Sequence, residues 1–321
     1  MNVLAFVLLL MLAVGVRAES FVFINHQQGS SVAVYEKDSM KLVTEIPSLE
    51  GPTGIVISQN GDWLAVSYPE KGIISYLDSK RLIPLEHLQV GGAPFGLTMA
   101  SDKLFYSDWN GGFVGVIEPG SGRILKKIPV GSSPAGLVTA KCQALVLVAN
   151  REDNSVSLID TDTLKVIKNI KVGERPFAID TDGRFAYVVN SGSNDMSIID
   201  MNSLYEVDRV STGRMPYGVA TAPEQYKIYV SNQMENTVSV IDSRIRKRIA
   251  LLKTGEYPEN IALDESGSRL YVLNWFDASL SIFDTGTGTE LLRKKLKQNS
   301  RAFGHFVEHD YIDTVCQNEN Q

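Results

Sequence analysis

A proline recurs along this chain at nearly constant spacing, and this regularity limits the possible folds more than any other feature. Successive prolines lie 42, 40, 42, 40 and 42 residues apart, and alanine takes the same place 44 residues after the last of them. The seven positions are Pro52, Pro94, Pro134, Pro176, Pro216, Pro258 and Ala302. A period of roughly 40 to 50 residues is typical of a propeller, in which each period forms one four-stranded blade.

Two further sets of residues keep the same phase as the proline. A polar residue closes one β-rich run in each repeat, and these residues are Asn25, Ser67, Ser107, Asn150, Asn190, Asn232 and Asn274. An acid ends the next run at Asp78, Glu118, Asp160, Asp200, Asp242 and Asp284. The runs alternate, are rich in Val, Ile and Tyr, and are bounded by turn residues, which predicts strands. We therefore predict an all-β fold, a seven-bladed β-propeller of four-stranded antiparallel blades.

The two ends of the repeat predict how the ring closes. The segment "FVFINHQQGSSVAVYEKD" supplies strands B and C without a strand A, whereas "AFGHFVEH" supplies a strand A without a strand B. We expect the C-terminal strand A to join the N-terminal strands B to D, because this pairing removes an open sheet edge. The propeller should then span residues 19–312, with a C-terminal tail over residues 313–321.

The first 18 residues, "MNVLAFVLLLMLAVGVRA", have the pattern of a signal peptide. They combine a short apolar core with small residues near Ala18, where a signal peptidase cleaves. A membrane-spanning helix needs about 20 apolar residues, and this apolar run is shorter, so we expect no transmembrane segment after cleavage. An uncleaved anchor is the alternative. The pattern predicts a periplasmic or secreted protein, and the net charge of −6 makes nucleic acid an unfavourable partner.

The chain has two cysteines, Cys142 and Cys316. An oxidising compartment would permit them to pair. Cys142 is expected in the turn between strands A and B of the fourth blade, and Cys316 belongs to the tail. A disulfide between them is therefore possible. The sequence has no C-x-x-C-H haem attachment motif and no thiol cluster for zinc.

The segments "YVVN", "YVSN" and "YVLN", which end at Asn190, Asn232 and Asn274, resemble the motif of the YVTN β-propeller family. That family contains periplasmic, secreted and cell-surface seven-bladed proteins, among them YncE-like members. The resemblance covers essentially residues 19–312 and implies the WD40-like propeller fold, but it implies no particular function. Ser67 and Ser107 depart from the motif.

Candidate binding residues are found where the repeats differ. The loops before strand A and after strand B emerge on one face, which we call the top face. Arginine and aromatic side chains gather there and suit an anionic or planar ligand, unless the aromatic rings instead plug the central funnel and pack between blades. The candidate ligand-binding residues are Arg175, Arg214, Arg301, His26, Trp109, Arg151, Phe177, Tyr217, Tyr257, Trp275 and His305.

His305 is the most unusual of these residues, because the other six repeats have an apolar residue at its position. It is either a core histidine at the closure of the ring or a ligand or proton carrier near the funnel. His26 belongs to the same blade and could be its partner.

Basic runs at 244–248 and 293–297 fall in or beside outermost strands of two neighbouring blades. Charge at such positions prevents edge-to-edge pairing. The alternative is a rim that meets an anionic surface or a protein partner.

The sequence contains none of the common hydrolase, zinc, phosphate-loop or EF-hand motifs, and no metal site or catalytic residue is predicted. The leading hypothesis is a monomeric, non-enzymatic binding or interaction scaffold without a cofactor, which takes a protein partner or a small anionic or planar ligand. One alternative is a haem-type tetrapyrrole-binding or redox-accessory propeller, with Arg175, Arg214 and Arg301 holding carboxylates and His26 or His305 as axial ligand. A second alternative is a secreted propeller lyase or hydrolase with His305 as base.

Overall fold

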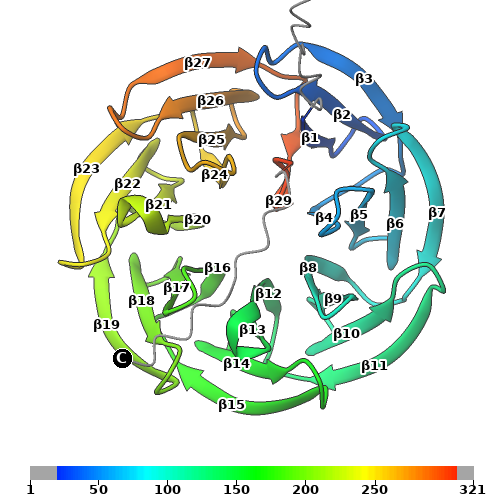
Figure 1. Ribbon diagram of the computed structural model, residues 1–321, viewed down its shortest axis with the longest axis horizontal. Coiled ribbons are helices and arrows are strands. Elements are labelled where there is room, and N and C mark those ends of the chain that lie inside the picture. Colours follow the sequence, from blue (N-terminus) through cyan, green and yellow to red (C-terminus); the bar gives the residue numbers. More distant parts are fainter. Residues whose placement is uncertain (1–19, 309–321) are drawn as a thin grey trace, which may run out of the picture.

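The computed structural model describes residues 20–308, which form a ring of seven β-sheets around a central axis (Figure 1). Each sheet is one blade, and its strands run outward from the axis in the order A to D. Neighbouring strands within a blade are antiparallel. The predicted all-β, seven-bladed propeller with four-stranded antiparallel blades is confirmed.

The strand bounds follow the repeat. The first three blades contain β1 (Phe21–His26), β2 (Ser31–Glu36) and β3 (Leu42–Pro47); β4 (Gly54–Ile57), β5 (Trp63–Tyr68), β6 (Ile73–Asp78) and β7 (Ile83–Gln89); and β8 (Pro94–Ala100), β9 (Lys103–Asp108), β10 (Phe113–Glu118) and β11 (Arg123–Pro129). Blades 4 and 5 contain β12 (Pro134–Ala140), β13 (Leu145–Asn150), β14 (Ser155–Asp160) and β15 (Lys165–Lys171), and β16 (Pro176–Thr181), β17 (Phe185–Asn190), β18 (Asp195–Asp200) and β19 (Tyr205–Ser211). Blades 6 and 7 contain β20 (Pro216–Ala222), β21 (Lys227–Asn232), β22 (Thr237–Asp242) and β23 (Lys247–Lys253), and β24 (Pro258–Leu263), β25 (Arg269–Asn274), β26 (Ser279–Asp284) and β27 (Glu290–Lys295).

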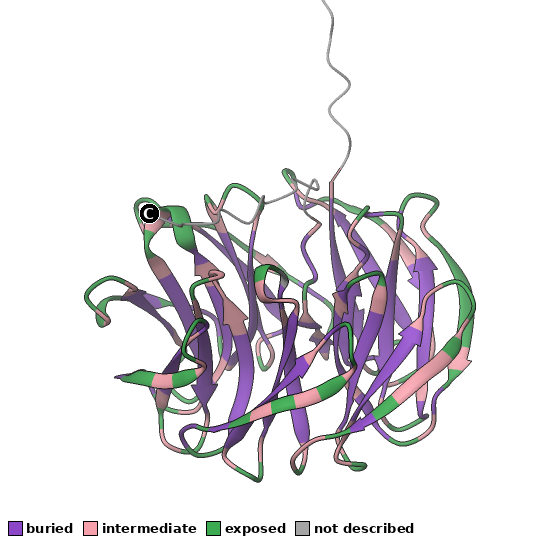
Figure 2. Ribbon diagram, turned by 60° about the horizontal axis from the view of Figure 1, so that its bottom comes forward, coloured by how far each residue is buried: buried purple, intermediate pink, exposed green. Residues whose placement is uncertain are grey.

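Burial changes from the inner to the outer strands of a blade (Figure 2). Strands B and C are almost entirely buried, because apolar side chains on both of their faces pack against the two neighbouring blades, as in β13 and β14. Strand D is largely exposed and mixes apolar residues with polar and charged ones, as in β15. The basic runs around Arg246 and Lys294 lie in or beside the outer strands β23 and β27, where most of their basic side chains are exposed.

The ring closes in blade 1, where the two ends of the chain meet. The short strand β28 (Ser300–Arg301) pairs with β1, and Phe306 then accepts a backbone hydrogen bond of 2.8 Å from Phe23. Between these contacts β29 (Phe303–Gly304) departs from β1 and pairs in parallel with β4 of blade 2. The predicted closure is therefore confirmed, but strand A of this blade is split. Gly304 permits the split, since its φ of 115° is strongly disfavoured for other residues.

In the first three blades, strand B ends one residue later than the sequence predicted. The residue that pairs with the start of strand C is Asn in blades 4 to 7, as in Asn150↔Ser155, but it is His26, Tyr68 and Asp108 in blades 1 to 3. The expected residues Asn25, Ser67 and Ser107 each lie one position earlier. Ser107 has a role of its own there, because its hydroxyl donates to the carbonyl of Ala135 in the next blade at 2.6 Å.

Candidate functional site

The central channel is closed near the top face by a cluster of aromatic rings. The ring centroids of Phe95 and Phe303 lie 4.9 Å apart, those of Phe177 and Phe303 lie 5.2 Å apart, and those of Phe177 and Tyr217 lie 4.2 Å apart. Trp109 packs on Phe95 at 5.0 Å. These side chains come from blades 1, 3, 5 and 6, so they can meet only at the axis. We call these five residues the aromatic plug.

Arg301 lies beside the plug and is already paired. Its guanidinium group donates bidentately to the Glu259 carboxylate, with distances of 2.6 and 2.7 Å. The Glu259 side chain is only 3% exposed, and Gln233 donates a further hydrogen bond to it. The guanidinium carbon also lies 5.3 Å from the Trp275 ring. Because Glu259 neutralises Arg301, this arginine is a weak candidate for holding a carboxylate ligand.

The other three candidate arginines do not form one cationic site. The Arg214 Nε atom lies 3.6 Å from the Glu235 carboxylate, and Arg214 also donates to the carbonyl of Met234. Arg151 pairs with its neighbour Glu152. Arg175 is exposed in the loop before β16. The structure therefore places these arginines on the top face, each in its own loop.

The two candidate histidines lie in different surroundings. His26 is 1% exposed, and its Nδ1 atom lies 3.0 Å from the Ser31 hydroxyl. Burial lowers the pKa of His26, with the charge of Lys297 adding to this effect and the charge of Glu45 opposing it. His305 is exposed and lines a pocket at the opposite end of the channel. Among the contacts of the described residues, nothing joins the two imidazoles.

The top loops of blades 6 and 7 present an exposed apolar surface. Tyr257 packs on Phe276 with ring centroids 4.5 Å apart, Phe276 stacks on Trp275 at 4.8 Å, and the Tyr257 hydroxyl lies 3.9 Å from the sulfur of Met215. Phe276 is 58% exposed and Met234 is 50% exposed. We call Met215, Met234, Tyr257, Trp275 and Phe276 the aromatic–methionine patch.

Sequence reasoning missed Met234, although the repeat contains a signal for it. Met234 and Phe276 both lie two residues after the end of strand B. The corresponding residues of the other blades are polar or small, namely Gln28, Glu70, Asn110, Glu152 and Gly192. Most other large apolar side chains that are exposed in the described residues lie on outer strands, and Tyr226 and Ile245 lie in turns at the opposite end of the molecule.

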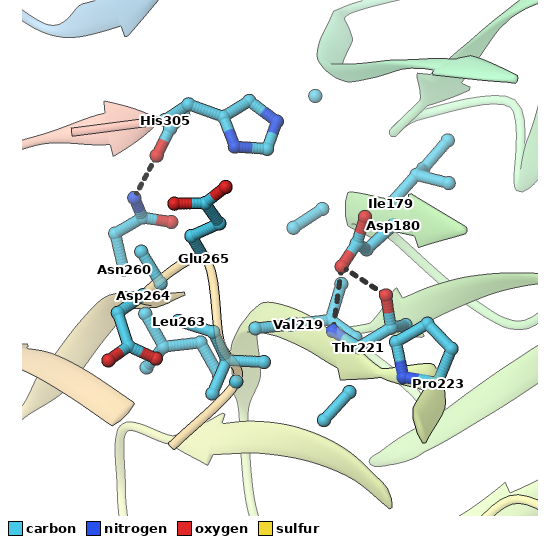
Figure 3. A pocket seen from close by; sticks show the side chains of 18 of the residues that line it. Ile179, Asp180, Val219, Thr221, Pro223, Asn260, Leu263, Asp264, Glu265 and His305 are labelled. Carbon is cyan, nitrogen blue, oxygen red and sulfur yellow. Dashed lines mark hydrogen bonds between the residues drawn. The ribbon is translucent and has the colours of Figure 1, made fainter. Parts of the chain in front are cut away.

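The lower end of the channel, opposite the top face, contains a pocket of about 300 Å³ (Figure 3). Apolar residues of successive strands A form its wall, and the acidic residues lining it are Asp180, Glu224, Asp264 and Glu265. His305 and Glu265 lie on one side of the pocket and Asp180 lies on the other. Burial raises the pKa of Asp180, although the nearby His305 and the hydrogen bonds from Thr181 and Thr221 act in the opposite direction.

Cys142 lies in the short 3₁₀ helix η1 (Lys141–Gln143), between strands A and B of blade 4 as expected. Its predicted partner Cys316 lies outside the described residues. Within residues 20–308 no group of histidine, cysteine, aspartate and glutamate side chains is arranged to hold a metal ion. The same residues contain no helix long and apolar enough to span a membrane.

No family model matches this chain, nor does any curated protein. The resemblance to the YVTN family is thus not confirmed by a family match. The fold, in contrast, is found in many solved structures. A structure of Kuenenia stuttgartiensis hydrazine synthase has a TM-score of 0.73 and 18% identity, and the match covers 82% of this chain and 92% of that chain.

Two further structures are similar to this chain over most of its length. A functionally unknown protein from Desulfotomaculum acetoxidans has a TM-score of 0.75 at 15% identity, with 85% of this chain and 94% of that chain covered. The dihydro-heme d1 dehydrogenase NirN, in complex with DHE, has a TM-score of 0.67 at 12% identity, and the match covers 87% of this chain and 73% of that chain. At such low identity these likenesses show the propeller fold alone.

Proposed function

We propose that this protein is an exported, non-enzymatic binding propeller that docks a protein partner on its top face. The aromatic–methionine patch is the observation that carries the proposal. Trp, Tyr, Phe and Met are the residue types enriched in the cores of protein interfaces, and two of the five patch residues are at least half exposed. An exposed group of such side chains on a folded protein commonly marks an interaction site.

The surroundings of the patch support a rigid docking surface. Trp275 packs against the Arg301 guanidinium, which is itself fixed by the buried Glu259 carboxylate. The loop that carries Phe276 is joined to the preceding loop by a backbone hydrogen bond of 3.2 Å from Phe276 to Glu256. A surface that is ordered before binding loses little conformational entropy when a partner docks.

A small anionic ligand in the funnel receives less support. The plug fills the axis, and Arg301, Arg214 and Arg151 each have a carboxylate partner. The tetrapyrrole hypothesis depends on Arg175, Arg214 and Arg301 and on a histidine ligand, and only Arg175 of these arginines, exposed in the loop before β16, has no carboxylate partner named above. His26 is buried within blade 1, and His305 shares its pocket with four acidic residues that would repel the carboxylates of such a macrocycle. These residues therefore do not fit a carboxylate-rich macrocycle, and we derive no chemistry through one.

For the lyase or hydrolase hypothesis, in which His305 is the base, the same four acidic residues of the pocket disfavour anionic substrates.

Site-specific photocrosslinking in the producing cells tests the proposal. A benzophenone amino acid replaces Phe276 in one variant and Tyr205 in the control. Tyr205 is 63% exposed but lies on the outer strand β19. We expect one discrete adduct from position 276, none from position 205, and a lower yield when Met234→Ser is added. Equal adducts from both positions, or an adduct that is insensitive to Met234→Ser, would contradict docking at the patch.

A further inference from the structure

We propose that the pocket at the lower end of the channel is a separate binding site for an organic cation, namely a primary ammonium or guanidinium group on a small apolar body. The pocket is formed by the last residues of strands A and by the turns that follow them, on the face opposite the aromatic–methionine patch. Its ligand is thus independent of the proposed protein partner.

Charge selects the class of ligand. Four acidic residues line the pocket, whereas no lysine or arginine lines it and His305 is its one basic residue among those described. The whole chain is nearly balanced, with 31 basic and 37 acidic residues, so this composition is local. An anion would meet four carboxylates, of which Asp180 and Asp264 are half-buried and Glu224 and Glu265 are exposed at the mouth, and it would be repelled most strongly by the half-buried pair. A cation would be attracted by the same groups.

Asp180 is the residue best placed to bind the cationic group. Its Oδ2 atom accepts hydrogen bonds of 2.7 and 2.9 Å from the backbone amide and hydroxyl of Thr221, and its Oδ1 atom accepts one of 2.8 Å from the Thr181 amide. The carboxylate is therefore held in one orientation before any ligand arrives. A carboxylate offers about four lone-pair positions, so an acceptor position remains on Oδ1.

The repeat indicates that Asp180 is not needed to build a blade. The equivalent positions in the other six repeats hold Val56, Thr98, Val138, Ala220, Ala262 and Phe306. Asp180 is half-buried, and His305 is the one basic residue among the described residues that line its pocket, so its carboxylate gains from a further cation. A bound ammonium group would supply that gain, because a charge-assisted hydrogen bond is stronger than one between neutral groups.

The remaining wall of the pocket accepts an apolar body. Leu97, Leu137, Ile179, Val219 and Ile261 come from five successive strands A, and Phe303 of the plug lies among the lining residues as well. A volume of about 300 Å³ is at the small end of the range for ligand sites. The pocket thus suits a compact amine with one ring or a short alkyl chain.

Three probes of similar shape test the proposal on the purified full-length protein. Benzylamine, benzyl alcohol and benzoate are titrated by isothermal calorimetry and by NMR at neutral pH. We expect benzylamine to bind about tenfold or more tightly than benzyl alcohol, and benzoate to bind more weakly than either. Equal affinity for the three probes, or a preference for benzoate, would overturn the assignment.

Variants place the binding in this pocket. Asp180→Asn should weaken benzylamine binding about tenfold or more, whereas the matched control Asp162→Asn, at an exposed acid of blade 4, should leave it unchanged. Glu265→Gln changes an exposed turn residue and should also weaken binding. Val219→Phe should abolish it by filling the pocket. If all three pocket variants bound benzylamine like the control, the ligand would lie elsewhere and the inference would fail.

Discussion

His26 occupies the strand-end position that asparagine holds in four other blades, and its side chain makes the same contact. Its Nδ1 atom lies 3.0 Å from the Ser31 hydroxyl, just as the Asn150 amide donates to the Ser155 hydroxyl at 3.1 Å. The Nε2 atom is buried and has no hydrogen-bond partner among the described residues. His26 therefore stabilises the β1–β2 turn through its contact with Ser31, and protonation of its buried ring is unfavourable.

The lowered pKa of His26 predicts an acid-sensitive stability. As the pH falls toward and below about 6.5, the unfolded chain takes up a proton at this histidine more readily than the folded protein does, so the free energy of unfolding decreases. For a single group the slope is at most about 1.4 kcal/mol per pH unit, and it is steepest between the unfolded and folded pKa values. Chemical denaturation at a series of pH values between 7 and about 5 measures it, above the range in which ordinary carboxylates titrate.

His26→Asn is the matched variant, because asparagine restores the residue of blades 4 to 7 and can keep the bond to Ser31. We expect this variant to lose the slope below pH 6.5, whatever its absolute stability. His87→Asn changes a histidine on the outer strand β7 and should retain the slope. A slope that persists in His26→Asn would show that another group is responsible.

The strands A depend on small residues where neighbouring blades approach the axis. A Cβ atom added to Gly54 in β4 would lie 2.1 Å from the carbonyl oxygen of Phe95 and 2.6 Å from the Ser67 hydroxyl. Glycine at this position recurs as Gly96, Gly136 and Gly218, and each has a backbone atom of the next blade within 2.7 Å of its added Cβ. The recurring glycines thus set the spacing between successive inner strands.

Gly54→Ala is therefore expected to destabilise the protein by about 1–3 kcal/mol, the usual cost of forcing an atom into a packed interior. The control is Gly286→Ala in an open turn, where the nearest atom to the added Cβ is Asp284 Oδ1 at 3.3 Å. Thermal and denaturant unfolding compare the two variants. Equal stability of Gly54→Ala and Gly286→Ala would mean that β4 can move away from β8 at no cost.

The repeat predicted the elements well because strand period and turn chemistry are local properties of a sequence. The recurring residue types were a less reliable guide at the end of strand B, because residues other than asparagine can occupy that position. His26, Tyr68 and Asp108 do so in blades 1 to 3, and the predicted strand end lies one residue too early in those blades. The pairing of Arg301 with Glu259 could not be read from the repeat. It depends on how two side chains of neighbouring blades turn toward each other, which spacing does not determine.

At the scale of the whole molecule, the aromatic plug and the closure of blade 1 depend on the same few C-terminal residues. Phe303 contacts Phe95 and Phe177 across the axis, while Phe306 and Val307 are fully buried against β1. Burial of each such side chain contributes about 1.5–3 kcal/mol. Since the net stability of a folded domain is about 5–15 kcal/mol, this segment accounts for a large part of it.

Deletion of residues 302–321 should therefore abolish the cooperative, monomeric fold. The deletion leaves most of the β1 edge without a partner and removes Phe303 from the plug, and an unpaired edge invites pairing with a second chain. The control lacks only residues 309–321 and keeps every contact described above. Both proteins are studied with reductant, so that Cys142 is a thiol in each.

We expect the control to melt cooperatively as a monomer in calorimetry and light scattering, whereas the longer deletion forms aggregates or lacks a melting transition. A soluble monomer that melts at the temperature of the control would show that six blades and an open first sheet suffice, and the closure would then have little energetic importance.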